Sequence, residues 1–512
     1  MQPQYGNTQS LWMRQEDVPR FEPLQGNLQT DVCVVGTGIA GLTTAYLLAR
    51  EGRSVVMLEA GALAAGESSR TTAHLSFALD DRFYELETLF GQDGARKAYE
   101  SHARAVELIE EIVTGEKIDC EFTRLDGYLF APPADNTNEL SREYAAATRA
   151  GLRVEQLEQT PLKTFNTGPC LRFADQAQFN PLRYLAALAR KITELGSKIY
   201  THTRVEKVTG GETPSVETKR GDRVRASAVV LATNTPIHDN LTIHARQAPY
   251  RTYAIGASIP WDAIPRALYW DTLDPYHYVR LQSSSTPASP KGNDILIVGG
   301  EDHRQAFAKD ERSHFEWLEQ WTRKNFPVKD VKYRWSGMVC EPADSLAFIG
   351  RDNSEKNVFI ATGDSGHGMT HGTIAGMLLT DLIQGRPNQW EKLYDPSRVT
   401  ARATLDYISD NAQVLSSLAD WVTPGDVASA EDIAPGCGAL VRKGLEKRAV
   451  YRNHYGSFFE LSAVCPHLGC IVAWNQAEES WDCPCHGSRF DPYGKMLRGP
   501  ATEDLKHIKE AQ

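Results

Sequence analysis

The chain has 512 residues, of which 41% are hydrophobic, and it carries a formal net charge of −11 at pH 7. This length predicts more than one domain, and this composition is sufficient for buried cores. The acidic balance argues against a nucleic-acid partner, because phosphate binding depends on clustered lysine and arginine. No basic start leads into an apolar stretch, and no apolar run reaches about 18 residues, so we expect a cytoplasmic protein without a membrane span.

The first strong pattern is a strand, a glycine-rich turn and a helix. Residues 31–35 form a β-branched run typical of a buried strand, and a helical pattern follows directly. Gly36, Gly38 and Gly41 match G-x-G-x-x-G, whose glycines allow a tight turn, approach of a pyrophosphate and close helix packing. A second strand ends at Glu59, where a carboxylate can accept hydrogen bonds from a ribose. The pattern predicts dinucleotide binding, and the alternative is a plain glycine-rich turn.

Two later segments continue the nucleotide-binding pattern. An apolar strand ends at residues 232–234, and another at 358–361 leads into a glycine-rich turn and an amphipathic helix. The start of that helix is a second N-terminus available to a cofactor. No second nucleotide fingerprint occurs, so a nicotinamide partner is not expected.

Residues 274–281, DPYHYVRL, alternate in the manner of a strand. Tyr276, Tyr278 and Arg280 would then share one face. Because guanidinium binds carboxylate through two hydrogen bonds, this face is a candidate clamp for a substrate carboxylate. The alternative is an ordinary sheet face with surface pairs.

Cysteine is used unevenly along the chain. Five single cysteines are expected to be buried thiols: Cys33, Cys120, Cys170, Cys340 and Cys437. The C-terminal part instead holds two Cys–His pairs, Cys465-x-His467 and Cys483-x-x-His486. Such pairs favour a [2Fe–2S] centre in which two histidines bind one iron. A zinc site is the alternative, although zinc ribbons favour C-x-x-C pairs.

Residues 31–400 resemble FAD-dependent oxidoreductases of the D-amino acid oxidase and glycine oxidase superfamily. The matching pieces, in order, are VVGTGIAGLTTAYLLAREGRSVVMLEA, VVLATN, YHYVRL with LIVGGEDH, YRWSGMVCEPADSLAFIG, FIATGDSGHGMT and LYDPSR. The resemblance implies an α/β FAD-binding domain of the Rossmann-like, glutathione-reductase type and an α+β substrate domain on an antiparallel sheet. It also implies which residues hold FAD: Gly36, Gly38, Ile39, Ala40, Gly41, Glu59, Ala60, Ser69, Arg70, Thr71, Thr72, Val205, Ala232, Thr233, Gly363, Gly366, His367, Gly368, Met369 and Thr370.

The substrate site is less defined than the FAD site. Tyr276, Tyr278, Arg280 and His74 are candidates for the pocket, and no catalytic base is assigned. Some relatives attach flavin covalently through histidine, so His74 is either such a link or an ordinary pocket histidine.

The C-terminal part resembles a Rieske domain through CPHLGC, CPCHGS and RGPA. The resemblance implies that Cys465, His467, Cys483 and His486 bind the cluster and that Cys470 and Cys485 form a disulfide. It also completes the expected domain map: FAD-binding segments 28–80, 190–245 and 345–395, substrate segments 81–189 and 246–344, a helical linker 396–424 and a small all-β Rieske domain 425–512.

The two resemblances together predict an oxidoreductase that takes electrons from an amine, amino acid or related small substrate. FAD would pass them singly through the cluster to an external acceptor protein. Three alternatives stay open: flow from a donor protein through the cluster to FAD, a pure electron carrier with a vestigial pocket, and a Rieske module that serves only for docking.

Overall fold

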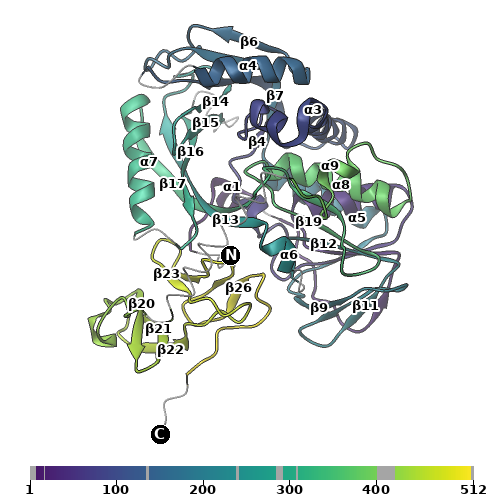
Figure 1. Ribbon diagram of the computed structural model, residues 1–512, viewed down its shortest axis with the longest axis vertical. Helices are drawn as coiled ribbons and strands as arrows, with labels where there is room; N and C mark the ends of the chain where they lie inside the picture. Colours follow the sequence, from purple (N-terminus) through teal and green to yellow (C-terminus); the bar gives the residue numbers. More distant parts are fainter. Residues whose placement is uncertain are drawn as a thin grey trace.

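The structure is a computed structural model that describes residues 7–16, 18–133, 138–237, 241–283, 292–306, 310–400, 421 and 423–508. Within these ranges, no helix is both long and apolar enough to cross a membrane. The described residues build a sheet covered by helices, a large mixed sheet, and a C-terminal part of two small sheets (Figure 1).

A buried six-stranded sheet forms the centre of the first part. In order across the sheet, its strands are β18 (Phe348–Arg351), β19 (Val358–Thr362), β12 (Ala228–Asn234), β2 (Val32–Val35), β3 (Val55–Leu58) and β8 (Lys198–Tyr200). All neighbours pair in parallel except the edge strand β18. Parallel strands covered on both faces need continuous apolar runs, which the valines and isoleucines of β2, β3 and β19 supply.

Two glycine-bearing helices pack closely beside this sheet. They are α2 (Ile39–Arg50) and α8 (Gly368–Ile383), and α5 (Pro181–Glu194) packs against α2 and β8. A Cβ on Gly376 would lie 2.4 Å from Thr43 Cγ2, so a larger residue would separate α2 from α8. The close packing brings the N-termini of both helices to one cavity, which Gly38 and His367 line.

A small sheet extends the first part. Its order is β1 (Leu28–Gln29), β11 (Arg223–Arg225), β10 (Ser215–Thr218) and β9 (Val205–Thr209). Val216 and Val224 of this sheet are fully buried and belong to the same apolar core as β2, so the small sheet is anchored on the six-stranded one.

The large sheet is antiparallel except where β14 pairs with β5. Its order is β17 (Asp330–Pro342), β13 (Gln247–Ile259), β16 (Asp294–Arg304), β15 (His277–Gln282), β14 (Leu268–Asp271), β5 (Thr123–Phe130), β7 (Cys170–Gln178) and β4 (His74–Leu75), with β6 (Val154–Leu157) also on β7. Its helices are α3 (Phe83–Gly115, interrupted at Gly91), α4 (Asn138–Ala150) and α7 (Arg312–Asn325). Because β4 pairs with β7, the chain already joins this sheet inside the range 28–80.

The C-terminal part consists of two small antiparallel sheets. One contains β20 (Cys437–Lys443), β21 (Glu446–Arg452) and β22 (Phe458–Ser462), and the other β23 (Ala473–Asn475), β24 (Ser480–Asp482), β25 (Arg489–Phe490) and β26 (Met496–Arg498). Figure 1 shows β23 and β26 toward the rest of the chain, with β20 to β22 at the far end.

Short elements complete the described chain: α1 (Leu11–Gln15), η1 (Glu67–Ser69), α6 (Leu241–His244), α9 (Glu391–Tyr394) and η2 (Ala430–Asp432). The helical linker expected at 396–424 falls mostly outside the described residues.

Candidate flavin cavity and metal centre

The turn between β2 and α2 is shaped so that only glycine fits at two positions. Gly36 has a φ of 104°, and a Cβ on it would lie 2.4 Å from the carbonyl oxygen of Ala232. A Cβ on Gly41 would lie 2.1 Å from the Gly36 oxygen. Side chains at these positions would push α2 away from the turn. The start of α2 can therefore line a cavity, where its free N–H groups suit phosphate oxygens.

Glu59 lines the same cavity directly after β3. Its Oε2 accepts hydrogen bonds from the Thr37 backbone N–H at 3.0 Å and from the Thr37 hydroxyl at 2.9 Å. Its Oε1 accepts from the Gly61 N–H at 2.9 Å. The carboxylate is thus held beside the glycine-rich turn, the place where the sequence predicts contact with a ribose.

The cavity is about 310 Å³ and runs from this turn to the N-terminus of α8. It joins two helix N-termini and a held carboxylate, which is a set of groups that fits an extended dinucleotide such as FAD. The predicted cofactor residues that line it are Gly36, Gly38, Ile39, Ala40, Glu59, Ala60, Arg70, Thr71, Thr72, Val205, Ala232, Thr233, Gly366, His367, Gly368 and Met369.

Four predicted cofactor residues lie outside the cavity lining. Gly41 serves the packing of α2, as its place in the motif suggests. Ser69 donates its hydroxyl to the Gly66 carbonyl at 2.8 Å, and Thr370 donates to the His367 carbonyl at 3.1 Å. Gly363 packs against Pro342, 2.6 Å from where a Cβ would stand. These four residues support the cavity wall through packing and through hydrogen bonds to other protein groups.

The structure separates the substrate candidates into two groups. Tyr276, Tyr278 and His74 line the cavity, whereas Arg280 does not. Arg280 is buried, and its Nη1 donates to the carbonyl oxygens of Thr72, Ala73 and Phe179 at 2.9–3.2 Å. The expected carboxylate clamp is therefore corrected. The alternation did place the three side chains on one face, but the segment after η1 supplies carbonyls that hold the guanidinium.

His74 is a neutral cavity residue. Its Nδ1 lies 3.1 Å from the Thr72 hydroxyl, and its ring meets that of Tyr278 edge-on at 5.4 Å. Burial, assisted by Arg280, lowers the pKa of His74 to about 3.

The four predicted metal ligands lie on two neighbouring loops of the C-terminal part. Cys465 and His467 follow β22, and Cys483 and His486 lie between β24 and β25. The centroids of the two imidazole rings are 5.0 Å apart, and both thiols are buried. The Nδ1 of His486 is buried and has no hydrogen-bond partner among the described residues. Two sulfurs and two nitrogens arranged in this way fit a [2Fe–2S] centre with mixed ligation.

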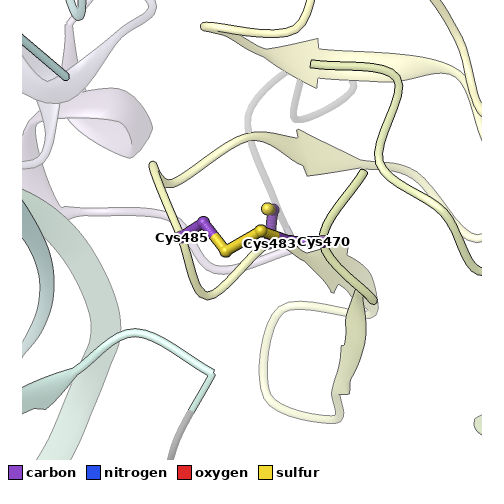
Figure 2. Close-up of side chains that lie close together, drawn as sticks. All are labelled: Cys470, Cys483 and Cys485. Carbon is purple, nitrogen blue, oxygen red and sulfur yellow. A yellow bond between two sulfur atoms is a disulfide. The ribbon is translucent and has the colours of Figure 1, made fainter. Parts of the chain in front are cut away.

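A disulfide joins Cys470 to Cys485, which confirms the pairing that the resemblance implied. Figure 2 shows the sulfur of Cys483 beside this bond. The ligand atoms of the three cysteines all lie within 4.8 Å of one another. Since disulfide sulfurs are not thiolates, only Cys483 of the three is available to a metal.

The comparisons with known proteins agree with both sites. The model of the "FAD dependent oxidoreductase" family matches residues 31–382, and the model of the "Rieske [2Fe-2S] domain" matches residues 423–509.

The chain belongs to the FAD-dependent oxidoreductase family.

It is an FAD-dependent oxidoreductase with a C-terminal Rieske domain, and these domains imply FAD and a [2Fe–2S] cluster as cofactors. The chain is 32% identical over 503 residues to the putative Rieske 2Fe-2S iron-sulfur protein YhfW of Bacillus subtilis, covering 98% of this chain and 97% of that protein. It is 26% identical to the gamma-glutamylputrescine oxidoreductase of Escherichia coli, over 72% and 87% of the two chains. Glycine oxidase from Geobacillus kaustophilus shares the fold, with a TM-score of 0.60 at 19% identity over 73% of this chain and 100% of that one.

The Rieske domain is joined to the flavin part by buried charges. Arg251 of β13 donates to Asp482 of β24 at 3.0 Å, and Arg489 donates to the same carboxylate at 3.0 Å. Arg70 lies 3.5 Å from Glu478. All five side chains are buried. We call these five residues the interface charge network. Arg70, one of the residues expected to hold FAD, belongs to this network and also lines the cavity.

The flavin part also covers the histidine ligands. His244 of α6 is buried, and its ring lies 5.0 Å from that of His467 and 5.8 Å from that of His486. Burial, followed by the charges of His467 and Arg304, lowers the pKa of His486 to about 3. A neutral imidazole is the form that binds metal.

Several cavity residues could not be found by the sequence reasoning. Asp80 and Asp302 line it, as do residues 496–499, 501 and 502 of the Rieske domain. The acids at 301 and 302 follow two glycines at a strand end, which is a weak signal, and strand alternation does not tell which acid faces the cavity. RGPA at 498–501 belongs to the Rieske pattern, but it does not predict that this segment reaches the flavin cavity, because the docking of one domain on another is not encoded in a short motif.

Proposed function

We propose that this protein is a dehydrogenase that oxidises the C–N bond of an amine or amino acid and delivers the electrons one at a time to an external acceptor protein. When bound, FAD accepts two electrons as a hydride and a [2Fe–2S] cluster carries single electrons, so the pair converts two-electron chemistry into one-electron transport. The names of the gamma-glutamylputrescine oxidoreductase and the glycine oxidase support a C–N substrate.

The observation that carries the proposal is a cavity wall shared by both domains. Residues 496–499, 501 and 502 of the Rieske domain line the cavity together with the flavin-binding turn. Met338 of β17 lines it as well, and its sulfur lies 2.7 Å from the point where a Cβ on Gly487 would stand. Gly487 is the neighbour of His486, so one side chain contacts both the cavity and the ligand loop. This arrangement supports electron passage within one chain.

The interface charge network supports a fixed position for the Rieske domain. Burial raises the pKa of Glu478, but Arg70, Arg489 and Arg251 outweigh this and hold the pKa at about 2. Glu478 is therefore ionised at neutral pH. Separating the domains would leave charged groups without their partners, which is costly for groups of this kind. We infer that electrons pass without a swing of the domain.

The test is anaerobic visible absorption spectroscopy on purified protein loaded with FAD and cluster. Amines, N-methylated amines and amino acids are added in turn, and a separate sample is photoreduced without substrate. We expect bleaching of the flavin followed by loss of the cluster bands in both experiments. If photoreduced flavin leaves the cluster oxidised, the relay is wrong. If no compound bleaches the flavin while a one-electron donor reduces both centres, the flow runs from an external donor to FAD.

A further inference from the structure

One region of the cavity lining, built on the large sheet, is acidic and aromatic. Asp302 near the end of β16, Asp80 after β4, Tyr276 before β15 and Tyr278 within it all line the cavity. We call these four residues the acidic end. They come from different segments of the large sheet, whose pairing of β15 with β16 sets Tyr278 opposite Gly299. A Cβ on Gly299 would lie 2.2 Å from the Tyr278 ring, so this glycine gives the ring its place.

Asp302 has a carboxylate oxygen without a protein partner. Its Oδ1 is buried and accepts no hydrogen bond from the described residues. Its carboxylate also interacts with the hydroxyl of Thr252, which itself lies 3.2 Å from the Tyr278 hydroxyl. A buried carboxylate oxygen is normally satisfied by a donor, and leaving it unsatisfied is costly. A donor on a ligand would remove this cost.

The wall beside Asp302 is made of aromatic faces. The rings of Tyr276 and Tyr278 stack with centroids 5.5 Å apart, and His74 meets Tyr278 edge-on. The π face of such rings attracts cations. A carboxylate next to stacked tyrosines is therefore complementary to an ammonium group.

The arginines near the cavity form ion pairs or hydrogen bonds with protein groups. Arg70 pairs with Glu478, and Arg498 pairs with Glu67 at 2.7 Å. Arg204 donates to the Met496 carbonyl at 3.0 Å. Two of these partners belong to the Rieske domain, as does Arg498 itself. Arg280 is held by backbone carbonyls, as described above.

The histidines of the cavity do not supply the missing positive charge. Burial lowers the pKa of His367, as it does that of His74 and of His371. All three rings are therefore neutral at pH 7. The described residues of this end therefore offer no cation, and its two acids can carry only negative charge, so a substrate carboxylate would meet repulsion here.

We propose that the acidic end is the subsite for the ammonium group of the substrate, with Asp302 as its counter-ion, and that it selects amines without a carboxylate on the carbon bearing nitrogen. This inference rests on the proposed function, because it names the substrate class of the same cavity. Asp302 and the tyrosine pair give the attraction, and the lack of an arginine among the four residues of the acidic end gives the discrimination.

Matched pairs of compounds test the selection. n-Butylamine is compared with both enantiomers of norvaline, and benzylamine with both enantiomers of phenylglycine, since each pair differs by one carboxylate. The FAD- and cluster-loaded protein is titrated anaerobically, and either a shift or a bleaching of the flavin absorption reports occupancy. We expect each amine to bind about tenfold or more tightly than its amino acid, in line with the cost of an unpaired charge in a buried site. Amino acids that bind as tightly as the amines, or amines that give no response, would overturn the proposal.

Two variants assign the selection to the acidic end. Asp302→Asn keeps the shape and removes the charge, and we expect amine affinity to fall about tenfold or more. Tyr276→Leu removes one aromatic face and should weaken amine binding about threefold, which keeps the test available if Asp302→Asn does not take up FAD. Asp330→Asn, an exposed carboxylate on β17 of the same sheet, is the matched control and should bind amines unchanged. Equal affinities in Asp302→Asn, Tyr276→Leu and the control would show that the subsite is wrong.

Failure of this inference differs from failure of the relay. If wild-type protein passes electrons from photoreduced flavin to the cluster but prefers amino acids, the subsite is wrong and the relay stands. If amines bind as expected and photoreduced flavin leaves the cluster oxidised, the relay is wrong and the subsite stands.

Discussion

Two regions of the flavin cavity differ in whether their charged side chains are paired within the protein. At the end next to the Rieske domain, Arg70 and Arg498 form ion pairs with Glu478 and Glu67. At the acidic end, Asp302 keeps a buried oxygen without a donor from the described protein. Charges that are paired inside the protein fix one domain on the other, whereas a carboxylate that lacks a donor is available to a ligand. The comparison separates residues that build the assembly from residues that bind.

The largest effect is expected when Glu478→Gln removes the ion pairs that this residue forms beside the Rieske domain. The variant removes the carboxylate that pairs with Arg70 and Arg489 and leaves Asp482, which pairs with Arg251 and Arg489. Removing one partner of a buried charge pair costs about 3–5 kcal/mol, because the remaining charge is uncompensated. We expect the free energy of unfolding in urea to fall by about this amount. The neighbouring Glu479 accepts a hydrogen bond from exposed Asn7, so Glu479→Gln is the control, and equal losses in the two variants would contradict the prediction.

The interface charge network also makes the free energy of unfolding fall at acidic pH. The pKa of Glu478 is held at about 2, below its ordinary 4.5, since the three arginines outweigh the effect of burial. A carboxyl group with a lowered pKa contributes its stability above about pH 4.5 and loses it as the pH falls toward 2. Urea titrations between these pH values should show a steeper loss in the wild type than in Glu478→Gln. Parallel curves would remove Glu478 from the explanation.

A smaller effect is expected where the domains touch through Met338. Gly487 has a φ of 81°, and a Cβ on it would lie 2.7 Å from the Met338 sulfur and 3.1 Å from Pro249 Cβ. Gly487→Ala should therefore cost about 1–2 kcal/mol in backbone strain and also press Met338 toward the cavity. We expect a shifted flavin absorption spectrum and slower reduction of the cluster after photoreduction.

Gly456 offers a matched control for this contact. Its φ is 91°, yet a Cβ on it would meet no atom within 4 Å. Gly456→Ala should introduce the same backbone strain. The flavin spectrum and the rate of cluster reduction after photoreduction should stay as in the wild type. A similar change in both variants would attribute the effect to strain and not to the contact with Met338.

Local sequence patterns predicted the parts of this molecule whose function depends on nearby residues. The turn at Gly36, the carboxylate of Glu59 and the pairing of Cys470 with Cys485 were all accessible from motifs and resemblance. Arg280 was misjudged, because strand alternation gives the face of a side chain but not the carbonyls that a distant segment brings to it. Asp302 was missed for the same reason. Its proposed role depends on the lack of a hydrogen-bond donor near its Oδ1 among the described residues, which a local pattern does not predict.

The smallest effect concerns the pH dependence of amine binding at the acidic end. Burial raises the pKa of Asp302 to about 7, with further contributions from Asp80 and Glu301, against the opposing effects of Thr252 and His277. A simple alkylamine stays protonated across this range, as lysine does. Above about pH 7 the carboxylate attracts the ammonium group, and below it the protonated acid does not. We expect the Kd of n-butylamine to rise about tenfold for each unit that the pH falls below 7, up to the affinity of the neutral form.

Asp302→Asn decides which group causes this dependence. The amide has no proton to gain, so its n-butylamine affinity should be weak and nearly independent of pH between about 5 and 8. Asp81 and Glu341 lie nearby, and burial raises the pKa of each, to about 7 and about 8. If Asp302→Asn keeps the wild-type slope, the dependence belongs to one of these two carboxyls. If the pH dependence disappears, the carboxylate of Asp302 causes it. Asp302 is then the group that distinguishes the acidic end from the ion-paired residues beside the Rieske domain.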